Sequence, residues 1–99
     1  MARLSIDLQD GFTDDTVVLH VGGKERFHKQ HVSTKPVIGW AESFQTEVSS
    51  GRVNLRVTVP TQGIVKTIPL EVSSDTHLGL SIVNGELEHI VSDQPFTYA

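Results

Sequence analysis

The sequence contains no cysteine among its 99 residues. This absence excludes disulfide bonds, thiolate zinc sites and cysteine nucleophiles. No apolar run approaches the roughly 20 residues of a membrane-spanning helix, and residues 1–7 lack the apolar core of a signal peptide. We therefore expect no membrane partner and, if Met1 is the natural start of the chain, a cytoplasmic protein.

Basic residues are also few, because 8 lysines and arginines stand against 12 aspartates and glutamates, for a formal net charge of −4. A surface that binds nucleic acid needs clustered positive charge, so we predict no nucleic-acid partner. The sequence also lacks a Gly-x-Ser-x-Gly nucleophile turn and a glycine-rich phosphate loop. We expect a protein that is not an enzyme and that carries no cofactor.

What the sequence has in abundance is alternation between apolar and polar residues. Residues 52–59 show it most cleanly, because their apolar side chains fall on every second position with polar residues between them. A period of two is typical of strands that have one buried face and one exposed face.

This pattern predicts eight short strands separated by turn residues. The expected ranges are 3–8, 16–21, 24–30, 38–48, 52–59, 64–72, 77–83 and 86–91. So many short strands favour an all-β fold, an antiparallel β-sandwich with immunoglobulin-like, fibronectin-like or transthyretin-like architecture. A small closed β-barrel is the alternative. We interpret residues 1–99 as one domain in which 92–99 form a C-terminal tail.

Two hairpins and one edge strand can be placed more closely. Asn84-Gly85 predicts a tight turn that sets Leu80 opposite His89. Gly22-Gly23 allows a two-residue loop that pairs Val21 with Lys24, or a longer loop that sets Leu19 opposite Phe27, and we prefer the second. Pro69 cannot donate to a ladder, which predicts that residues 64–72 form an edge strand. A bulge or bend is expected within 39–42.

The candidate metal ligands are histidines. His28 and His31 are three residues apart, and His20 lies nearby in the predicted hairpin. On a strand, that spacing points two side chains to opposite faces. We therefore predict no metal site and keep these three histidines as weak candidates. The acidic residues Asp14 and Asp15 are interpreted as part of a turn, because their spacing does not match a calcium loop.

The candidate binding residues are Trp40, His89, Phe96 and Tyr98. Trp40 shares strand parity with apolar neighbours and is interpreted first as a core residue. His89 is expected to be partly desolvated, because the hairpin register places it on an apolar face. Phe96 and Tyr98 are expected to fold back over an open end of the sandwich or to dock on a neighbouring chain.

These observations favour a non-catalytic β-sandwich module that binds another protein, or that binds a second copy of itself to form a homodimer. The alternative function is a small-molecule or carbohydrate-binding domain that uses Trp40. A histidine metal site is the third.

Overall fold

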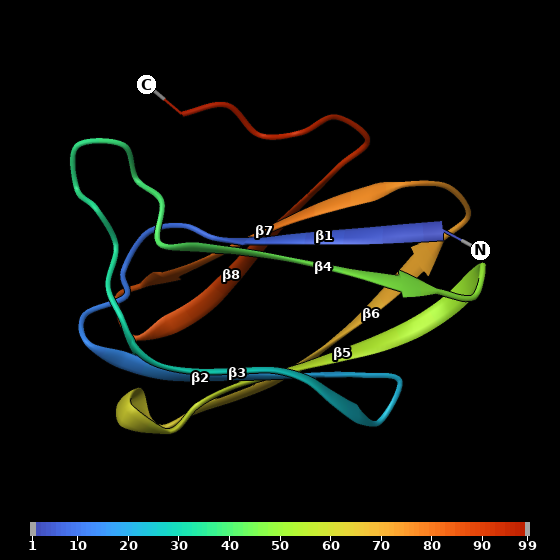
Figure 1. Ribbon diagram of the computed structural model, residues 1–99. Helices are drawn as coiled ribbons and strands as arrows, with labels where there is room; N and C mark the ends of the chain where they lie inside the picture. Colours follow the sequence, from blue (N-terminus) through green and yellow to red (C-terminus); the bar gives the residue numbers. More distant parts are fainter. Residues whose placement is uncertain (1, 99) are drawn as a thin grey trace.

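The computed structural model describes residues 2–98, and it forms two four-stranded sheets (Figure 1). Met1, on which the expected compartment depends, and Ala99, the last residue of the predicted tail, lie outside the described residues. The strands are β1 (Ala2–Leu8), β2 (Asp15–Val21), β3 (Lys24–Val32), β4 (Glu42–Val48), β5 (Gly51–Val59), β6 (Ile64–Val72), β7 (Thr76–Val83) and β8 (Glu86–Ser92).

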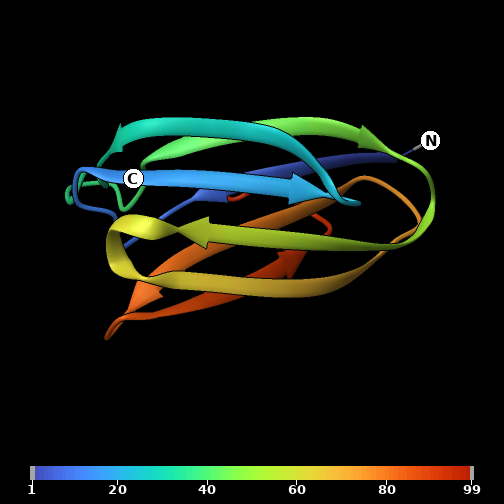
Figure 2. The ribbon, with the colours of Figure 1, turned by 90° about the horizontal axis from the view of Figure 1, so that it is seen from below.

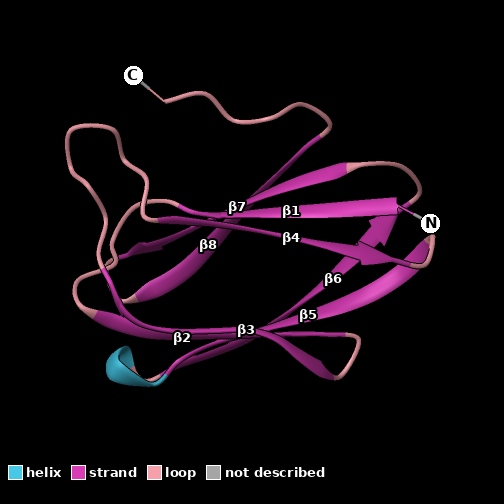
Figure 3. Ribbon diagram, in the orientation of Figure 1, coloured by secondary structure: helices cyan, strands magenta, loops and turns pink. Residues whose placement is uncertain are grey.

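The only helical element between residues 2 and 98 is a single 3₁₀ turn, η1 (Pro60–Gln62) (Figure 3). The Pro60 ring suits the first position of such a turn, and Gly63 ends it with a positive φ of 67°. In this part of the chain no helix is long and apolar enough to cross a membrane.

Sheet A has the order β4-β1-β7-β8 and sheet B the order β3-β2-β5-β6. The two sheets form separate layers in the view of Figure 1, and the view from below in Figure 2 shows sheet B lying across sheet A, which confirms the predicted sandwich rather than the barrel. One detail differs from the antiparallel expectation, because β1 pairs with β7 in parallel. These two strands lie far apart in the sequence, so no tight turn forces them to run in opposite directions. Membership of an immunoglobulin-like, fibronectin-like or transthyretin-like class stays a prediction.

The core lies between the sheets and is built from the alternating residues. Along β7, for example, Leu78, Leu80 and Ile82 are buried. Their counterparts on β5, Leu55, Val57 and Val59, come from the inner face of sheet B and are fully buried. The burial pattern thus follows the period of two that the sequence shows.

The hairpins confirm most of the predicted registers. Leu80 lies opposite His89, as the Asn84-Gly85 turn predicts, and β6 is an edge strand. The β2–β3 hairpin combines the two registers that the sequence allowed. Val21 pairs with Lys24 across a two-residue turn, and a bulge farther along restores Phe27 opposite Leu19.

The fourth strand is shorter than predicted, because it begins at Glu42 rather than at residue 38. Residues 36–39 form a turn in which the N–H groups of Ile38 and Gly39 both donate to the carbonyl of Lys35. Gly39 has a positive φ of 68°, which is not an extended conformation, so the strand begins only after it. The predicted bend at 39–42 is therefore the strand's beginning.

Candidate functional site

Each sheet ends in two edge strands, and three of these edges are protected. β3 carries two register shifts, and residues 24–31 apart from Phe27 are exposed and polar. β6 carries Pro69, which lacks an N–H group. β4 has a regular register, but its exposed side chains between residues 43 and 47 are all polar. Bulges, charges and prolines are the usual means of discouraging further pairing at an edge.

The fourth edge, β8, has neither a bulge nor a proline. Its register with β7 is regular over its whole length. It also exposes two large apolar side chains, Ile90 at 60% and Val91 at 53% of their surface. A regular edge with exposed apolar residues is a template for the addition of another strand.

Hydrogen bonds on the other side of β7 show which β8 backbone groups are free. The N–H of Gln9 donates to the carbonyl of Leu80 at 2.7 Å, and the N–H of Ile82 donates to the carbonyl of Asp10 at 2.8 Å. Leu80 and Ile82 therefore direct their backbone groups toward β1. In an antiparallel ladder, two residues directly opposite each other direct their backbone groups either both toward each other or both away from each other.

The partners of Ile82, Leu80 and Leu78 in β8 are Leu87, His89 and Val91. By the same alternation, these three residues direct their N–H and C=O groups away from β7. The outer edge of β8 is thus a row of donors and acceptors at every second residue, centred on His89, and of these groups the Leu87 carbonyl accepts a hydrogen bond from a side chain of sheet B.

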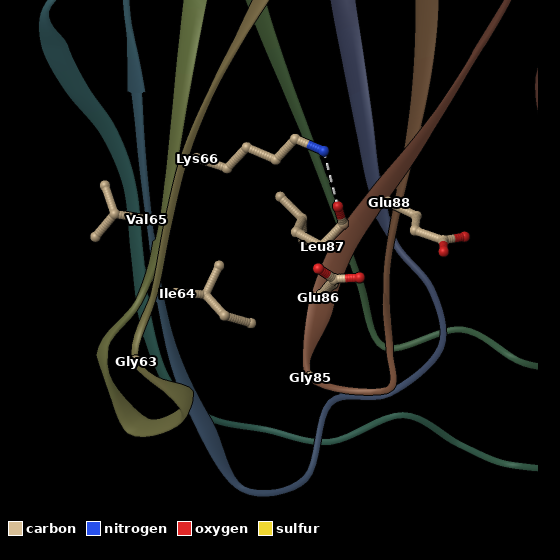
Figure 4. Close-up of a pocket in the computed structure, with 8 residues that line it drawn as sticks. All are labelled: Gly63, Ile64, Val65, Lys66, Gly85, Glu86, Leu87 and Glu88. Carbon is tan, nitrogen blue, oxygen red and sulfur yellow. Dashed lines mark hydrogen bonds between the residues drawn. The ribbon is translucent and has the colours of Figure 1, made fainter.

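A groove of about 470 Å³ lies between β6 and β8 (Figure 4). Ile64 and Leu87 face each other across it and are both buried, whereas Val65 and Glu88 point away from it. The complete lining is Gly63, Ile64, Val65, Lys66, Gly85, Glu86, Leu87 and Glu88. The groove is therefore apolar at its floor and charged at its rims.

Lys66 spans the gap between the two sheets. Its Nζ donates to the backbone carbonyl of Leu87 at 2.9 Å. Lys66 has the inward parity of its strand, between the buried residues Ile64 and Ile68. A lysine at this position reaches across the sandwich to one of the outward-facing carbonyls of β8, which it satisfies.

Asp15 holds the η1 turn, which precedes β6 and ends at Gly63, the first of the residues that line the groove. Its side chain is buried and accepts hydrogen bonds from the N–H of Thr13, from the Thr61 hydroxyl and from the Gln62 amide. Burial alone would raise the pKa of Asp15, but these three hydrogen bonds together lower it below its ordinary value. Asp15 is thus an ionised anchor for the start of β6.

The structure brings two of the predicted binding residues together on the outer face of sheet A. The Asp7 carboxylate accepts hydrogen bonds from Ser43 Oγ at 3.0 Å and from the Tyr98 hydroxyl at 2.6 Å. The indole Nε1 of Trp40 donates to the same Ser43 hydroxyl at 2.9 Å. Trp40 and Tyr98 are therefore linked through one carboxylate.

Tyr98 folds back onto the outer face of sheet A rather than over an open end of the sandwich. Burial, together with the hydrogen bond to Asp7, raises the pKa of Tyr98 to about 12. The side-chain amide of Gln9 donates to the Tyr98 hydroxyl at 3.1 Å. The same amide lies on Gly79, and a Cβ at that glycine would come within 2.7 Å of the Gln9 side chain. Phe96 is half-buried.

Trp40 is half-buried rather than a core residue. The Nζ of Lys35 lies 5.1 Å from the centre of its ring system. Such a cation–π contact occupies one face of the indole, so only part of the ring is available to a ligand.

The candidate metal-binding histidines do not form a cluster. Among residues 2–98, no three His, Asp or Glu side chains are close enough to hold one metal ion. His31 pairs with Asp14 at 2.7 Å, and His28 lies 3.9 Å from Glu25. His89 keeps its predicted register but is exposed, contrary to the expected desolvation, because β8 lies at the open edge of the sandwich.

Sequence reasoning missed the residues that shape the groove. The signal for Lys66 was present, since a lysine at an inward position of a strand indicates that the neighbouring layer does not cover it. The sequence places Asp15 only in a turn, because nothing in the local sequence points to Thr61 and Gln62 as its partners.

Comparison of the chain with protein-family models and with curated proteins finds no match to either.

Proposed function

We propose that this protein is a non-catalytic interaction module that binds an extended polypeptide segment along β8. The observation that carries the proposal is the free edge itself: outward backbone groups at Leu87, His89 and Val91, in a regular strand, beside exposed Ile90. The other three edges are protected by bulges, by proline or by polar side chains.

Strand addition supplies affinity through backbone hydrogen bonds and specificity through alternate side chains. On the inner side, an added strand would place apolar residues beside Leu87 and Val91. On the outer side it would lie beside Glu86, Glu88 and Ile90, where basic or apolar residues fit best. The groove next to Ile64 gives the inner side chains an apolar surface.

The test removes one outward N–H group without altering the β7–β8 ladder. His89→Pro does this, because the His89 N–H points away from β7, and His89→Ala is the matched control that changes only the side chain. A random heptapeptide library displayed on phage is selected against the unmodified protein. The selected peptides are then measured against both variants by calorimetry, with thermal melts to confirm folding.

The proposal predicts peptides with apolar residues at alternate positions that bind the His89→Ala variant normally. Against His89→Pro they should bind at least about tenfold more weakly, because hydrogen bonds to the edge are lost. Peptides that bind the proline variant equally well, or a library that yields no binder, would overturn it.

A second candidate function is small-molecule or carbohydrate binding at Trp40. The observation that favours it is a half-exposed indole beside the hydroxyl of Ser43 and the carboxylate of Asp7. Tryptophan fluorescence across a panel of oligosaccharides tests it directly, since Trp40 is the sole tryptophan. A saturable shift that is abolished by Ser43→Ala would support it, and an unchanged spectrum across the panel would count against it.

A further inference from the structure

We infer that the strand that pairs with β8 is β8 of a second copy of this chain, in antiparallel register about a two-fold axis at His89. This inference rests on the proposed function, because it names the occupant of the same edge. A closed two-fold contact uses one surface twice, so the surface must be complementary to itself. The following features of β8 meet that requirement.

His89 is the middle residue of β8, which spans Glu86–Ser92. Antiparallel pairing about His89 therefore gives every residue of the strand a partner. Leu87 lies opposite the partner's Val91, Glu88 opposite the partner's Ile90, and Glu86 opposite the partner's Ser92. No other centre pairs the whole strand.

The charges favour the same register. Centred on His89, the pairing sets neither glutamate against another glutamate. Centred on Glu88, it would oppose that residue to its own copy, and centred on Leu87 it would oppose Glu86 to the partner's Glu88. Like charges directly opposite each other destabilise a strand pair. Centring on Ile90 avoids this repulsion but leaves the first residues of β8 unpaired.

The backbone groups also match. Leu87, His89 and Val91 all direct N–H and C=O groups outward, and in this register they face one another across the axis. The pairing forms about six hydrogen bonds between the two chains. It requires Lys66 to release the Leu87 carbonyl, which then accepts from the N–H of the partner's Val91.

The contact joins two copies of sheet A into one continuous sheet and covers side chains that are otherwise open to water. Val91, 53% exposed, comes to lie beside the partner's Leu87. Ile90, 60% exposed, comes to lie beside the stem of the partner's Glu88. Burial of apolar surface and pairing of free backbone groups thus act together at one edge.

The sharpest test exploits the position of His89 on the axis. His89→Lys and His89→Glu each oppose two like charges in a homodimer, so each should weaken self-association about fivefold in sedimentation equilibrium. An equal mixture of the two variants opposes unlike charges and should associate at least as tightly as the unmodified protein. Equal weakness of the mixture and of its components would overturn the register.

A second pair of variants distinguishes this register from one centred on Ile90. Here Ile90→Glu faces the partner's Glu88 and should weaken association, whereas Ile90→Lys faces the same carboxylate and should retain it. In the shifted register both variants would oppose like charges and both would weaken it. Circular dichroism melts of all four variants confirm that the exposed substitutions leave the fold intact.

The two proposals fail in different ways. A chain that stays monomeric at every concentration, yet binds selected peptides in a manner sensitive to His89→Pro, overturns the self-pairing and leaves the proposed function standing. A monomer that also binds no peptide overturns both.

Discussion

The sandwich has two long sides where the edges of its sheets meet, one between β3 and β4 and the other between β6 and β8, and side chains fill them differently. Between β3 and β4, side chains reach across from both sheets: the rings of Phe27 and Phe44 lie 5.4 Å apart, and Lys29 forms an ion pair with Glu42. Between β6 and β8, one long side chain spans the gap, from Lys66 to the Leu87 carbonyl. The first side is thus closed by contacts between side chains, and the second leaves a groove.

This difference shows why the β8 edge is available and the β3 and β4 edges are not, whereas β6, on the same open side as β8, carries Pro69. Where aromatic and charged side chains meet between the layers, an incoming strand would have to displace them. At β8 it would displace only the ammonium group of Lys66, whose exposed position makes that exchange inexpensive. The location of the candidate site therefore follows from which residues fill the inward positions of the edge strands.

The largest expected effect is the loss of the anchor at one end of the open side. Asp15→Asn replaces one of the two buried carboxylate oxygens with an NH₂ group, which cannot accept a hydrogen bond from the donors that surround it. The substitution should lower the free energy of unfolding by about 3 kcal/mol. Asp14→Asn is the control, since Asp14 is exposed and asparagine tolerates its positive φ. Urea denaturation measures both variants, and an equal loss from the two would contradict the anchoring role.

The same residue predicts a pH dependence. The folded protein holds the pKa of Asp15 below its ordinary value, so its contribution is present above the unfolded pKa of about 3.9. The contribution is lost as the pH falls through the lower, folded pKa. The stability difference between the unmodified protein and Asp15→Asn should therefore be constant above about pH 5 and shrink below about pH 4.

The closed side can be opened by removing one ring. Phe27→Ala should cost about 2 kcal/mol, less than a fully buried phenylalanine, because Phe27 is half-buried. Val65→Ala on the open side is the comparison and should cost under about 0.5 kcal/mol. A double-mutant cycle with Phe44→Ala should show coupling between the two rings; additive losses would mean that their contact does not hold this side closed.

A smaller effect is expected where the tail crosses the outer face of sheet A. Tyr98→Phe removes the hydrogen bond to Asp7 and should cost about 1 kcal/mol below pH 10. The raised pKa means that this contribution is lost as the pH rises toward 12. Because Tyr98 is the sole tyrosine, ultraviolet titration reports it alone, and ionisation near pH 10 would show that the tail is not docked.

The smallest change in stability is expected at Lys66. Lys66→Met should alter the free energy of unfolding by no more than about 0.5 kcal/mol, since the side chain is exposed. It should nevertheless strengthen association through β8 about threefold, because the Leu87 carbonyl no longer has a competing donor. Weaker association in this variant would show that Lys66 supports the interface instead of blocking it.

Local sequence predicts the strands and hairpins well, because alternation and turn chemistry act over a few residues. The Asn84-Gly85 turn placed Leu80 opposite His89, and Pro69 marked an edge. The contacts that define the candidate site are of another kind. The bond from Lys66 to Leu87 and those from Asp15 to the η1 turn join segments that only the packing of two sheets brings together.

The parallel pairing of β1 with β7 could not be predicted for the same reason. It depends on how the chain crosses between sheets, which the period of two does not encode. The exposure of His89 likewise depends on strand order, since the same residue in an interior strand would be covered from both sides.

Amide hydrogen exchange along β8 as a function of protein concentration tests the central claim most directly. The amides of Glu88 and Ile90, which face β7, should be protected at every concentration. Those of His89 and Val91 should exchange rapidly in dilute solution and become protected as copies pair. Rapid exchange at His89 and Val91 at all concentrations, with protection appearing on β3 or β4 instead, would contradict it.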